Sequence, residues 1–270
     1  MLIDTHAHLY LEQFDHDRQK VVENAVCHDV KIMLLPNIDK DSIDPMMELC
    51  REFPGHCFPM MGLHPTSVKP DYQEQLELVK AWLEKEKFYA VGEMGIDLYW
   101  DKTFFHEQQE AFRVQVALAL KYDLPVVIHS RESFGELFEL LEETWKPGLK
   151  GVFHCFSGNL AQAEHIIALG FHLGIGGVLT YKNSGLPEVI EKIPLEHLLL
   201  ETDAPFLAPV PYRGKRNESA YIPDIAKKIA EIKKVSLEEV ASVTTENAKK
   251  LFNLPQAASH KPQATSRKLK

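Results

Sequence analysis

The sequence has few cysteines and no long apolar run, and both absences narrow the class of protein. Its 270 residues contain four cysteines, none in a C-x-x-C pair, which is too few for a disulfide scaffold. No window approaches the roughly 18 unbroken apolar residues that a membrane span needs. The first residues, MLID, lack the basic and apolar regions of a secretory signal. We therefore expect a cytoplasmic protein without a membrane span.

An excess of positive charge is also missing. The 30 Lys and Arg residues are outnumbered by 39 Asp and Glu residues, and the net charge is −9. This balance argues against a protein that coats duplex nucleic acid, and no feature calls for an obligate protein partner. Residues 255–270 differ, because they carry four basic residues and no acid. We expect them to form a disordered basic tail after a domain that spans residues 1–254.

Short apolar segments alternate with longer amphipathic ones along residues 1–254. The segments that read as buried parallel strands are Leu2–Leu9, Lys31–Pro36, Cys57–His64, Tyr89–Ile96, Pro125–His129, Gly151–Phe156, His172–Val178 and Leu198–Glu201. Apolar residues recur at helical spacing between them, as over Phe105–Tyr122 and Glu132–Trp145. Eight such units in about 250 residues predict an α/β fold, a single-domain (β/α)8 TIM barrel. A doubly wound sheet is the alternative, but no glycine-rich loop follows the first segment.

Extra helices are expected near the C-terminus. Ser236 and Glu239 have the spacing of a capping box, and a final helix should run from there through Leu251.

Polar residues close six of the eight predicted strands. In a barrel, side chains at the carboxyl ends of the strands converge on one site. His6 and His8 end the first strand, and their i, i+2 spacing places both rings on the same side. The other strand ends contribute His64, Glu93, His129, His154 and Asp203. Burying so many ionisable groups is costly unless they are paired or bind metal, so the sequence predicts a metal site.

The number of candidate ligands predicts two divalent ions, which could be Mg, Mn or Zn. Four histidines with Glu93 and Asp203 exceed what one catalytic ion with an open position uses. Glu93 is the predicted bridge, because a carboxylate can offer one oxygen to each ion. The remaining ligands divide into His6, His8 and Asp203 for one ion and His129 with His154 for the other.

The ordered motifs resemble those of the TatD family of metal-dependent deoxyribonucleases, within the amidohydrolase-type barrels. The matching stretches are DTHAHL (4–9), GLHP (62–65), GEMGID (92–97), PVVIHSR (125–131), HCFSG (154–158), ETDAP (201–205), YRGKRN (212–217) and TTENAKKLF (244–252). The resemblance runs from residue 1 to about residue 254. It implies the same six metal ligands, and Glu93 at the fourth strand favours this family over branches that use a carbamylated lysine.

Two side chains have predicted catalytic roles beyond that of Glu93. Asp203 is the candidate base that orients or deprotonates the attacking water, and a role as a pure ligand stays equally open. His64 is expected to donate a hydrogen bond beside the scissile group. The alternative is that His64 orients the loop that follows the third strand.

Substrate contacts are predicted on both sides of these residues. Arg213, Lys215 and Arg216 follow the last strand and could clamp a phosphate, Arg213 first, because a guanidinium grips two oxygens at once. A solvated surface run is the alternative. Tyr99, with Trp100 beside it, could stack on a base, while packing against the barrel rim is the alternative for at least one of them.

Three functions compete. The leading one is hydrolysis of phosphodiester bonds in DNA, as a 3′–5′ exonuclease on single-stranded ends that uses a two-metal-activated water. The resemblance supplies the DNA substrate, whereas the residues alone predict dimetal hydrolysis. The alternative is a dimetal amide or ester hydrolase, such as an aminoacyl-tRNA deacylase. A nucleic-acid-binding protein with a vestigial site would need a lost ligand, yet all six are present.

Overall fold

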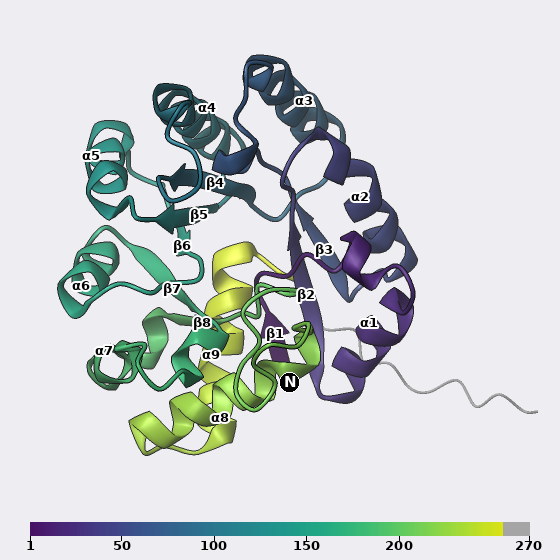
Figure 1. Cartoon of the computed structure of the whole chain (residues 1–270), viewed down its shortest axis with the longest axis vertical. Coiled ribbons are helices and arrows are strands. Elements are labelled where there is room, and N and C mark those ends of the chain that lie inside the picture. The colour runs from purple at the N-terminus through teal and green to yellow at the C-terminus, as the bar shows by residue number, and fades with distance from the viewer. Residues whose placement is uncertain (256–270) are drawn as a thin grey trace, which may run out of the picture.

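The apolar segments form parallel strands around a common axis, and helices ring them (Figure 1). The computed structural model describes residues 1–255. Its strands are β1 Leu2–Asp4, β2 Val30–Pro36, β3 Cys57–Met60, β4 Val91–Asp97, β5 Val126–Arg131, β6 Gly151–Phe153, β7 Phe171–Ile175 and β8 Leu198–Leu200. Its α-helices are α1 Arg18–Cys27, α2 Ile43–Glu52, α3 Tyr72–Lys85, α4 Phe105–Tyr122, α5 Phe134–Thr144, α6 Leu160–Ala168, α7 Leu186–Lys192, α8 Ile222–Lys233 and α9 Leu237–Phe252.

The strands close into a barrel. β1, β2 and β3 pair in that order, and β4 to β8 pair in theirs, all of them parallel. Hydrogen bonds close the two remaining seams. Gly92 N–H donates to the Met61 carbonyl over 2.9 Å between β3 and β4, and Thr5 N–H donates to the Leu200 carbonyl over 2.9 Å between β1 and β8. The predicted (β/α)8 barrel is therefore confirmed, and the doubly wound sheet is wrong.

Alternation along the strands separates two apolar layers. In β2, Leu34 packs inside the barrel while its neighbours Met33 and Leu35 pack under the helices, as a period of two requires. The interior set comprises Ile3, Ile32, Leu34, Phe58, Met60, Ala90, Val127, Val152 and Leu199. Buried on both faces, the strands have no polar face, which explains why they read as continuous apolar runs.

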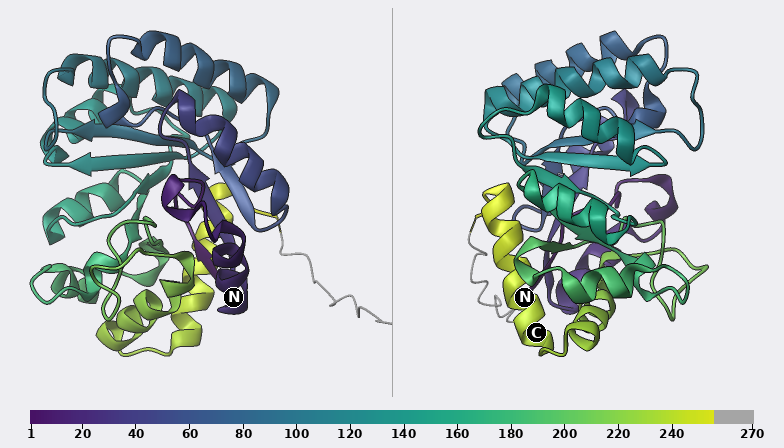
Figure 2. Two further views of the ribbon diagram at one scale, coloured as in Figure 1. Left: turned by 45° about the vertical axis from the view of Figure 1, so that its right-hand side comes forward. Right: turned by 90° about the vertical axis from the view of Figure 1, so that its left-hand side faces the viewer.

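The predicted extra C-terminal segment forms α9, which follows the regular eighth helix. Ser236 accepts a hydrogen bond from Glu239 N–H over 3.1 Å, so the helix begins where the sequence predicts. Leu251 and Phe252 of α9 join the interior set of the barrel. Figure 2 (right) shows α9 on the side where the strands begin, away from the long loop that follows β8. α9 therefore covers one end of the barrel and leaves the other for the site.

Several strands are shorter than predicted. The segments Leu2–Leu9 and Cys57–His64 leave the regular ladder at Asp4 and Met60. Beyond those points Ala7, Leu9, Met61 and Leu63 still pack in the apolar core, whereas the side chains of His6, His8 and His64 lie beside Glu93.

Three expectations concern the chain as a whole. No helix within residues 1–255 is long and apolar enough to cross a membrane. The four cysteines, all in this part of the chain, are free thiols. The predicted basic tail lies outside the described residues from residue 256 onward, so the domain boundary at residue 254 stays a prediction.

Candidate metal centre

Glu93, near the start of β4, lies at the centre of the six predicted metal ligands, and its side chain is 2% exposed. Its Oε2 lies 3.1 Å from His6 Nε2 and 3.6 Å from His8 Nε2. Its Oε1 lies 2.6 Å from His154 Nε2 and 2.9 Å from His129 Nδ1. Each oxygen of one carboxylate therefore faces a different pair of histidines, which is the arrangement that a bridging ligand needs.

Asp203 completes the group on the β1 side. Its Oδ1 lies 3.5 Å from His8 Nε2 and 3.7 Å from His6 Nε2. These three residues form one cluster of potential ligand atoms within 4.8 Å of one another, and His6, Glu93 and His154 form a second. The structure thus brings together all six residues that the sequence proposed as ligands. Glu93 and His129 lie within β4 and β5, and the other four lie just after β1, β6 and β8.

The backbone around β1 and β8 holds this side of the site in place. His8 N–H donates to the Ala204 carbonyl over 2.7 Å, and Asp203 N–H donates to the His6 carbonyl over 2.9 Å. Beneath them, the buried Asp4 carboxylate accepts hydrogen bonds from the hydroxyls of Thr202 and Ser219, each over 2.6 Å. The two chain segments that carry His6, His8 and Asp203 are therefore tied to each other, although nearly 200 residues separate them in the sequence.

Buried partners set which nitrogen two of the histidines present to the site. The Tyr10 hydroxyl donates to the Pro36 carbonyl over 2.6 Å, so it must accept from His8 Nδ1–H, which lies 3.0 Å away. His129 Nε2 lies 2.9 Å from Asp97 Oδ2, and its Nδ1 faces Glu93. Such outer partners orient metal-binding imidazoles and raise their basicity.

His64 presents a proton rather than a lone pair. Its Nδ1 accepts a hydrogen bond from Thr66 N–H over 3.1 Å, so in the neutral ring the proton sits on Nε2. That Nε2 lies 3.2 Å from Glu93 Oε1. Burial also lowers the pKa of His64, which keeps the ring neutral. His64 is therefore placed as a hydrogen-bond donor at the edge of the cluster. The hydrogen bond from Thr66 N–H to its Nδ1 also orients the loop after β3.

The electrostatics of the cluster fit bound cations. Burial, with repulsion from His154, lowers the pKa of His6 to about 4, so its lone pair is available at neutral pH. Burial alone would raise the pKa of Glu93, but the surrounding histidines hold it well below its ordinary value. The Nε2 atoms of His6 and His8 lie 3.3 Å apart, and His129 Nδ1 lies 3.2 Å from His154 Nε2. Nitrogen and carboxylate donors that converge so closely are a donor set suited to divalent metal ions.

The three basic residues after β8 do not act as one group. Arg216 pairs with both oxygens of Asp17 at 2.7 and 2.8 Å and donates to the Gln13 carbonyl over 2.8 Å. Its guanidinium is thus occupied near the start of α1, which separates it from the predicted phosphate clamp. Arg213 lies 4.4 Å above the Tyr181 ring, and no carboxylate within residues 1–255 pairs with it. Lys215 is exposed.

Side chains that sequence reasoning passed over surround the centre. Asp97 and Tyr10 hold the ligand histidines, and each stands a few residues beyond a ligand in a motif, which is the signal that could have found them. Glu201 is 1% exposed, and its Oε1 accepts from Cys155 N–H while its Oε2 has no partner in the described chain. Oε1 of Glu201 lies 3.8 Å from His154 Nδ1.

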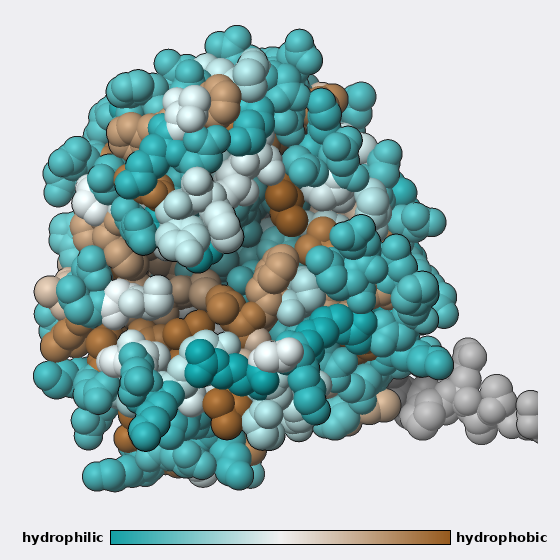
Figure 3. All heavy atoms as spheres, viewed as in Figure 1, coloured by the Kyte–Doolittle hydropathy of each residue, from teal (hydrophilic) through white to brown (hydrophobic). Residues whose placement is uncertain are grey.

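The mouth of the barrel is hollowed and has apolar side chains at its border (Figure 3). Phe206, 47% exposed, lies in the loop after β8 with its ring 6.4 Å from that of His8. Tyr99 and Trp100 are exposed in the loop after β4. Both predicted base-stacking residues are thus accessible, and Tyr99 also packs against Arg131, whose guanidinium carbon lies 3.8 Å from the centre of its ring.

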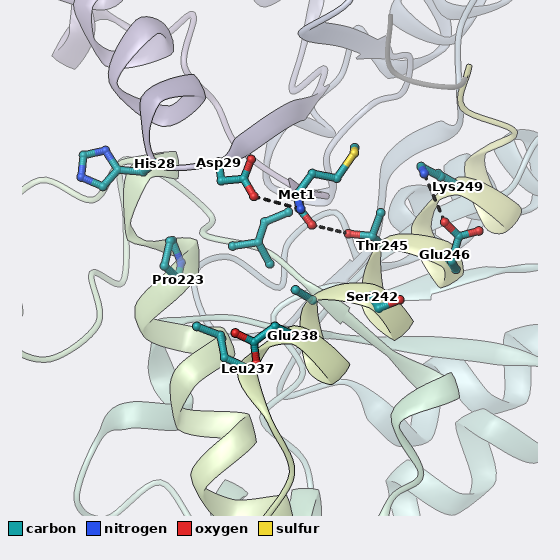
Figure 4. A pocket seen from close by; sticks show the side chains of 12 residues that line it. Met1, His28, Asp29, Pro223, Leu237, Glu238, Ser242, Thr245, Glu246 and Lys249 are labelled. Carbon is teal, nitrogen blue, oxygen red and sulfur yellow. Dashed lines mark hydrogen bonds and ion pairs between the residues drawn. The ribbon is translucent and has the colours of Figure 1, made fainter. Parts of the chain in front are cut away.

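A separate cavity of about 470 Å³ lies between the N-terminus, α8 and α9. Figure 4 shows the Met1 amine paired with Asp29, at 2.9 Å, and the Met1 carbonyl accepting from Thr245. None of the proposed metal ligands lines this cavity, so we assign the chemistry to the barrel mouth.

Comparison with known proteins places this geometry in a family. A family model described as TatD related DNase matches residues 3–253. The uncharacterized metal-dependent hydrolase YabD of Bacillus subtilis (strain 168) is 41% identical over 255 residues, which cover 94% of this chain and 100% of that protein. The 3′-5′ ssDNA/RNA exonuclease TatD of Pantoea vagans is 34% identical over 260 residues and covers 94% and 100%.

A solved structure agrees. The crystal structure of YjjV, a TatD homolog from Escherichia coli K12, matches with a TM-score of 0.88 at 33% identity, over 94% of this chain and 98% of that one. The residues that the family model matches include every candidate ligand of the metal centre described above. The chain therefore belongs to the TatD family of metal-dependent hydrolases.

Proposed function

We propose that this protein hydrolyses phosphodiester bonds of single-stranded DNA, releasing nucleotides from the 3′ end with two divalent metal ions. The observation that carries the proposal is the Glu93 carboxylate, whose two oxygens face separate sets of histidines. The name of the Pantoea vagans relative, a 3′-5′ ssDNA/RNA exonuclease, supports the substrate and the polarity. The cytoplasm stays our expectation for its location, and it rests on the cysteine content.

Six residues would hold the ions: His6, His8, Glu93, His129, His154 and Asp203. When bound, two such ions lower the pKa of a shared water and stabilise the oxygens of an in-line displacement. The ions could be Mg²⁺, Mn²⁺ or Zn²⁺, because imidazole and carboxylate ligands serve all three.

Asp203 is the proposed base. Its side chain is 15% exposed, against 2% for Glu93, so it is the carboxylate of the cluster that a water can reach from the mouth. Burial alone would raise the pKa of Asp203, but the hydrogen bond with His8 and the nearby histidines lower it. It is therefore ionised at neutral pH and can accept a proton.

His64 and Arg213 would bind the phosphate. The Thr66 N–H bond keeps the proton of His64 on Nε2, so this ring can donate to a phosphate oxygen beside Glu93. Arg213 carries a guanidinium without a carboxylate partner in the described chain, and the face of Tyr181 holds it near the β7 side of the mouth. Lys215 would add charge from the same loop.

The test uses metal-stripped protein supplied with Mg²⁺, Mn²⁺ or Zn²⁺ and single-stranded DNA labelled at either end. Progressive loss of a 3′ label as mononucleotide is the expected result. Glu93→Gln should abolish it, because the neutral amide cannot offer an anionic oxygen to each ion. The matched control is Glu139→Gln, an exposed glutamate on α5. Full activity in Glu93→Gln would contradict the bridging role.

Replacement of Arg213 distinguishes the proposed nuclease from the alternative, an amide or ester hydrolase. Arg213→Ala should greatly reduce cleavage of DNA, because a guanidinium contact to phosphate is charge-assisted and strong. Loss of acyl groups from aminoacyl-tRNA or a neutral ester should scarcely change, since neither places a phosphodiester at the metal centre. Faster turnover of an acyl substrate than of DNA by the wild type would overturn the proposal in favour of this alternative.

A further inference from the structure

Two adjacent aromatic side chains stand exposed where β4 ends. Tyr99 is 49% exposed and Trp100 is 68% exposed. Their rings meet edge to face, with centroids 4.9 Å apart and an interplanar angle of 87°. Exposure of large aromatic rings to water does not stabilise the fold, and exposed apolar patches commonly mark binding surfaces.

A cation joins them. The guanidinium carbon of Arg131, at the end of β5, lies 3.8 Å from the centre of the Tyr99 ring and 5.2 Å from that of Trp100. Arg131 forms no ion pair with a carboxylate within residues 1–255, so its charge remains available to a ligand. We call Tyr99, Trp100 and Arg131 the aromatic shelf.

The shelf is rigidly connected to the metal centre through Asp97, which is 1% exposed. Oδ1 of Asp97 accepts hydrogen bonds from the N–H groups of Tyr99 and Trp100, over 3.0 and 3.1 Å. Oδ2 of the same carboxylate lies 2.9 Å from His129 Nε2. One buried group therefore positions both a metal ligand and the start of the shelf.

A small recess separates Trp100 from the loop that contains His64. The recess has a volume of about 80 Å³, with Pro65 and Thr66 in its lining. Thr66 is the residue that caps His64. Lys69, also in this lining, pairs with Asp101 at 3.3 Å and so adds no free charge. Trp100 of the shelf therefore lies across this recess from the loop that carries His64.

We propose that the aromatic shelf binds the nucleotide next to the one being released, with its base stacked on Tyr99 or Trp100 and its phosphate on Arg131. The proposal rests on the proposed function and adds a second subsite to it. A ring face binds any base, because every base has a π face, and arginine supplies charge for the phosphate. In a duplex both faces of an internal base are covered by its neighbours, so only an unpaired strand end can use the shelf.

The test compares two single-stranded substrates. One is oligothymidylate of 12 nucleotides, and the other is identical except that a spacer without a base replaces the penultimate 3′ nucleotide. For the wild type, removal of this base should reduce kcat/KM by about 5- to 150-fold, mainly through KM, as expected for one stacked base. Tyr99→Ala with Trp100→Ala should cost a similar factor on the intact strand and show no further loss on the spacer strand.

The control variant is Trp145→Ala, which removes a tryptophan that is 46% exposed at the end of α5. It should keep the full sensitivity to the missing base. An equal loss on both substrates in the shelf variant would mean that the shelf only supports the site, and would overturn the proposal. Undiminished cleavage of the intact strand by the shelf variant would overturn it as well.

Failure of the proposed function can be told apart from failure of the shelf. Binding of the same two oligonucleotides to Glu93→Gln, followed by fluorescence anisotropy, needs no hydrolysis. Glu93→Gln should bind the intact strand more tightly than the spacer strand, and this difference should disappear when Tyr99→Ala and Trp100→Ala are added to it. That result supports the shelf even if the wild type cleaves neither strand. Cleavage by the wild type with no difference in binding between the two strands would refute the shelf alone.

Discussion

Replacement of Asp97 by asparagine should weaken metal binding while the fold is kept. In the wild type, one oxygen of Asp97 accepts from the N–H groups of Tyr99 and Trp100, and the other lies 2.9 Å from His129 Nε2. An asparagine has a single acceptor oxygen. If its NH2 group faced the two backbone N–H donors, both partly buried donors would lose their acceptor, at up to about 1 kcal/mol each.

The favoured arrangement of Asp97→Asn therefore keeps the oxygen on the backbone and turns the NH2 group toward His129. Nε2 must then accept, so the proton of the neutral ring moves to Nδ1, the atom that lies 2.9 Å from Glu93 Oε1. A protonated Nδ1 cannot bind a metal ion. Loss of such an outer partner typically costs about 10- to 100-fold in metal affinity, or about 1.4–2.7 kcal/mol.

Isothermal titration of the metal-stripped protein with Zn²⁺ or Mn²⁺ measures this loss. The matched control is Asp123→Asn, because Asp123 is 85% exposed and pairs with Lys150 on the surface. Thermal unfolding without metal checks that Asp97→Asn remains folded. Metal affinity equal to that of the wild type would refute the tautomer argument, and so would an equal loss in the control.

Three further predictions concern stability. The hydrogen bond with Arg216 lowers the pKa of Asp17. The stability that this ion pair adds is therefore present above the ordinary aspartate pKa and is lost as the pH falls through the lowered value. Arg216→Met should reduce the free energy of unfolding, measured with urea, by up to about 1 kcal/mol at pH 7 and by less near pH 2. Gly95→Ala should cost about 1–3 kcal/mol or more, because the new Cβ would lie 2.0 Å from the His129 carbonyl oxygen, whereas Gly135→Ala, with nothing within 4 Å, should not destabilise. Metal at about 100 times its Kd should raise the free energy of unfolding by about 2.7 kcal/mol, and a chelator should reverse this increase. Calorimetry measures the effect as a shift in Tm. An unchanged Tm would contradict metal binding by the folded state.

The convergence of the six candidate ligands could be predicted because a barrel converts sequence order into spatial proximity. His6 and His8 needed only the period of an extended segment, and most of the others needed only their positions where apolar segments end, whereas Glu93 lies near the start of β4. Side chains that hold these ligands follow a different rule. The Tyr10 hydroxyl accepts from His8 because it donates to the Pro36 carbonyl of β2, and that second contact depends on the register between β1 and β2.

The basic loop shows where a linear pattern misleads. Arg213 and Arg216 are three residues apart and look equivalent as charges. Arg216 reaches Asp17, which is 199 residues away in the sequence, whereas Arg213 stacks on Tyr181 from the loop after β7. The paired guanidinium of Arg216 and the available one of Arg213 can be told apart only from the packing of the loop after β8, which contacts the start of α1 on one side and the loop after β7 on the other.

The sequence by itself predicted the barrel and six candidate metal ligands, because apolar periodicity and the polar residues that interrupt or follow it are local properties of the chain. The tertiary structure decided how the candidate ligands are arranged: which oxygen of Glu93 faces which histidines, which nitrogen of His64 and His8 bears a proton, and which arginine has no carboxylate partner in the described chain. Those outcomes depend on hydrogen-bond partners from distant segments. A buried polar group must satisfy its bonds with whatever the fold places beside it, and no local pattern encodes that neighbour.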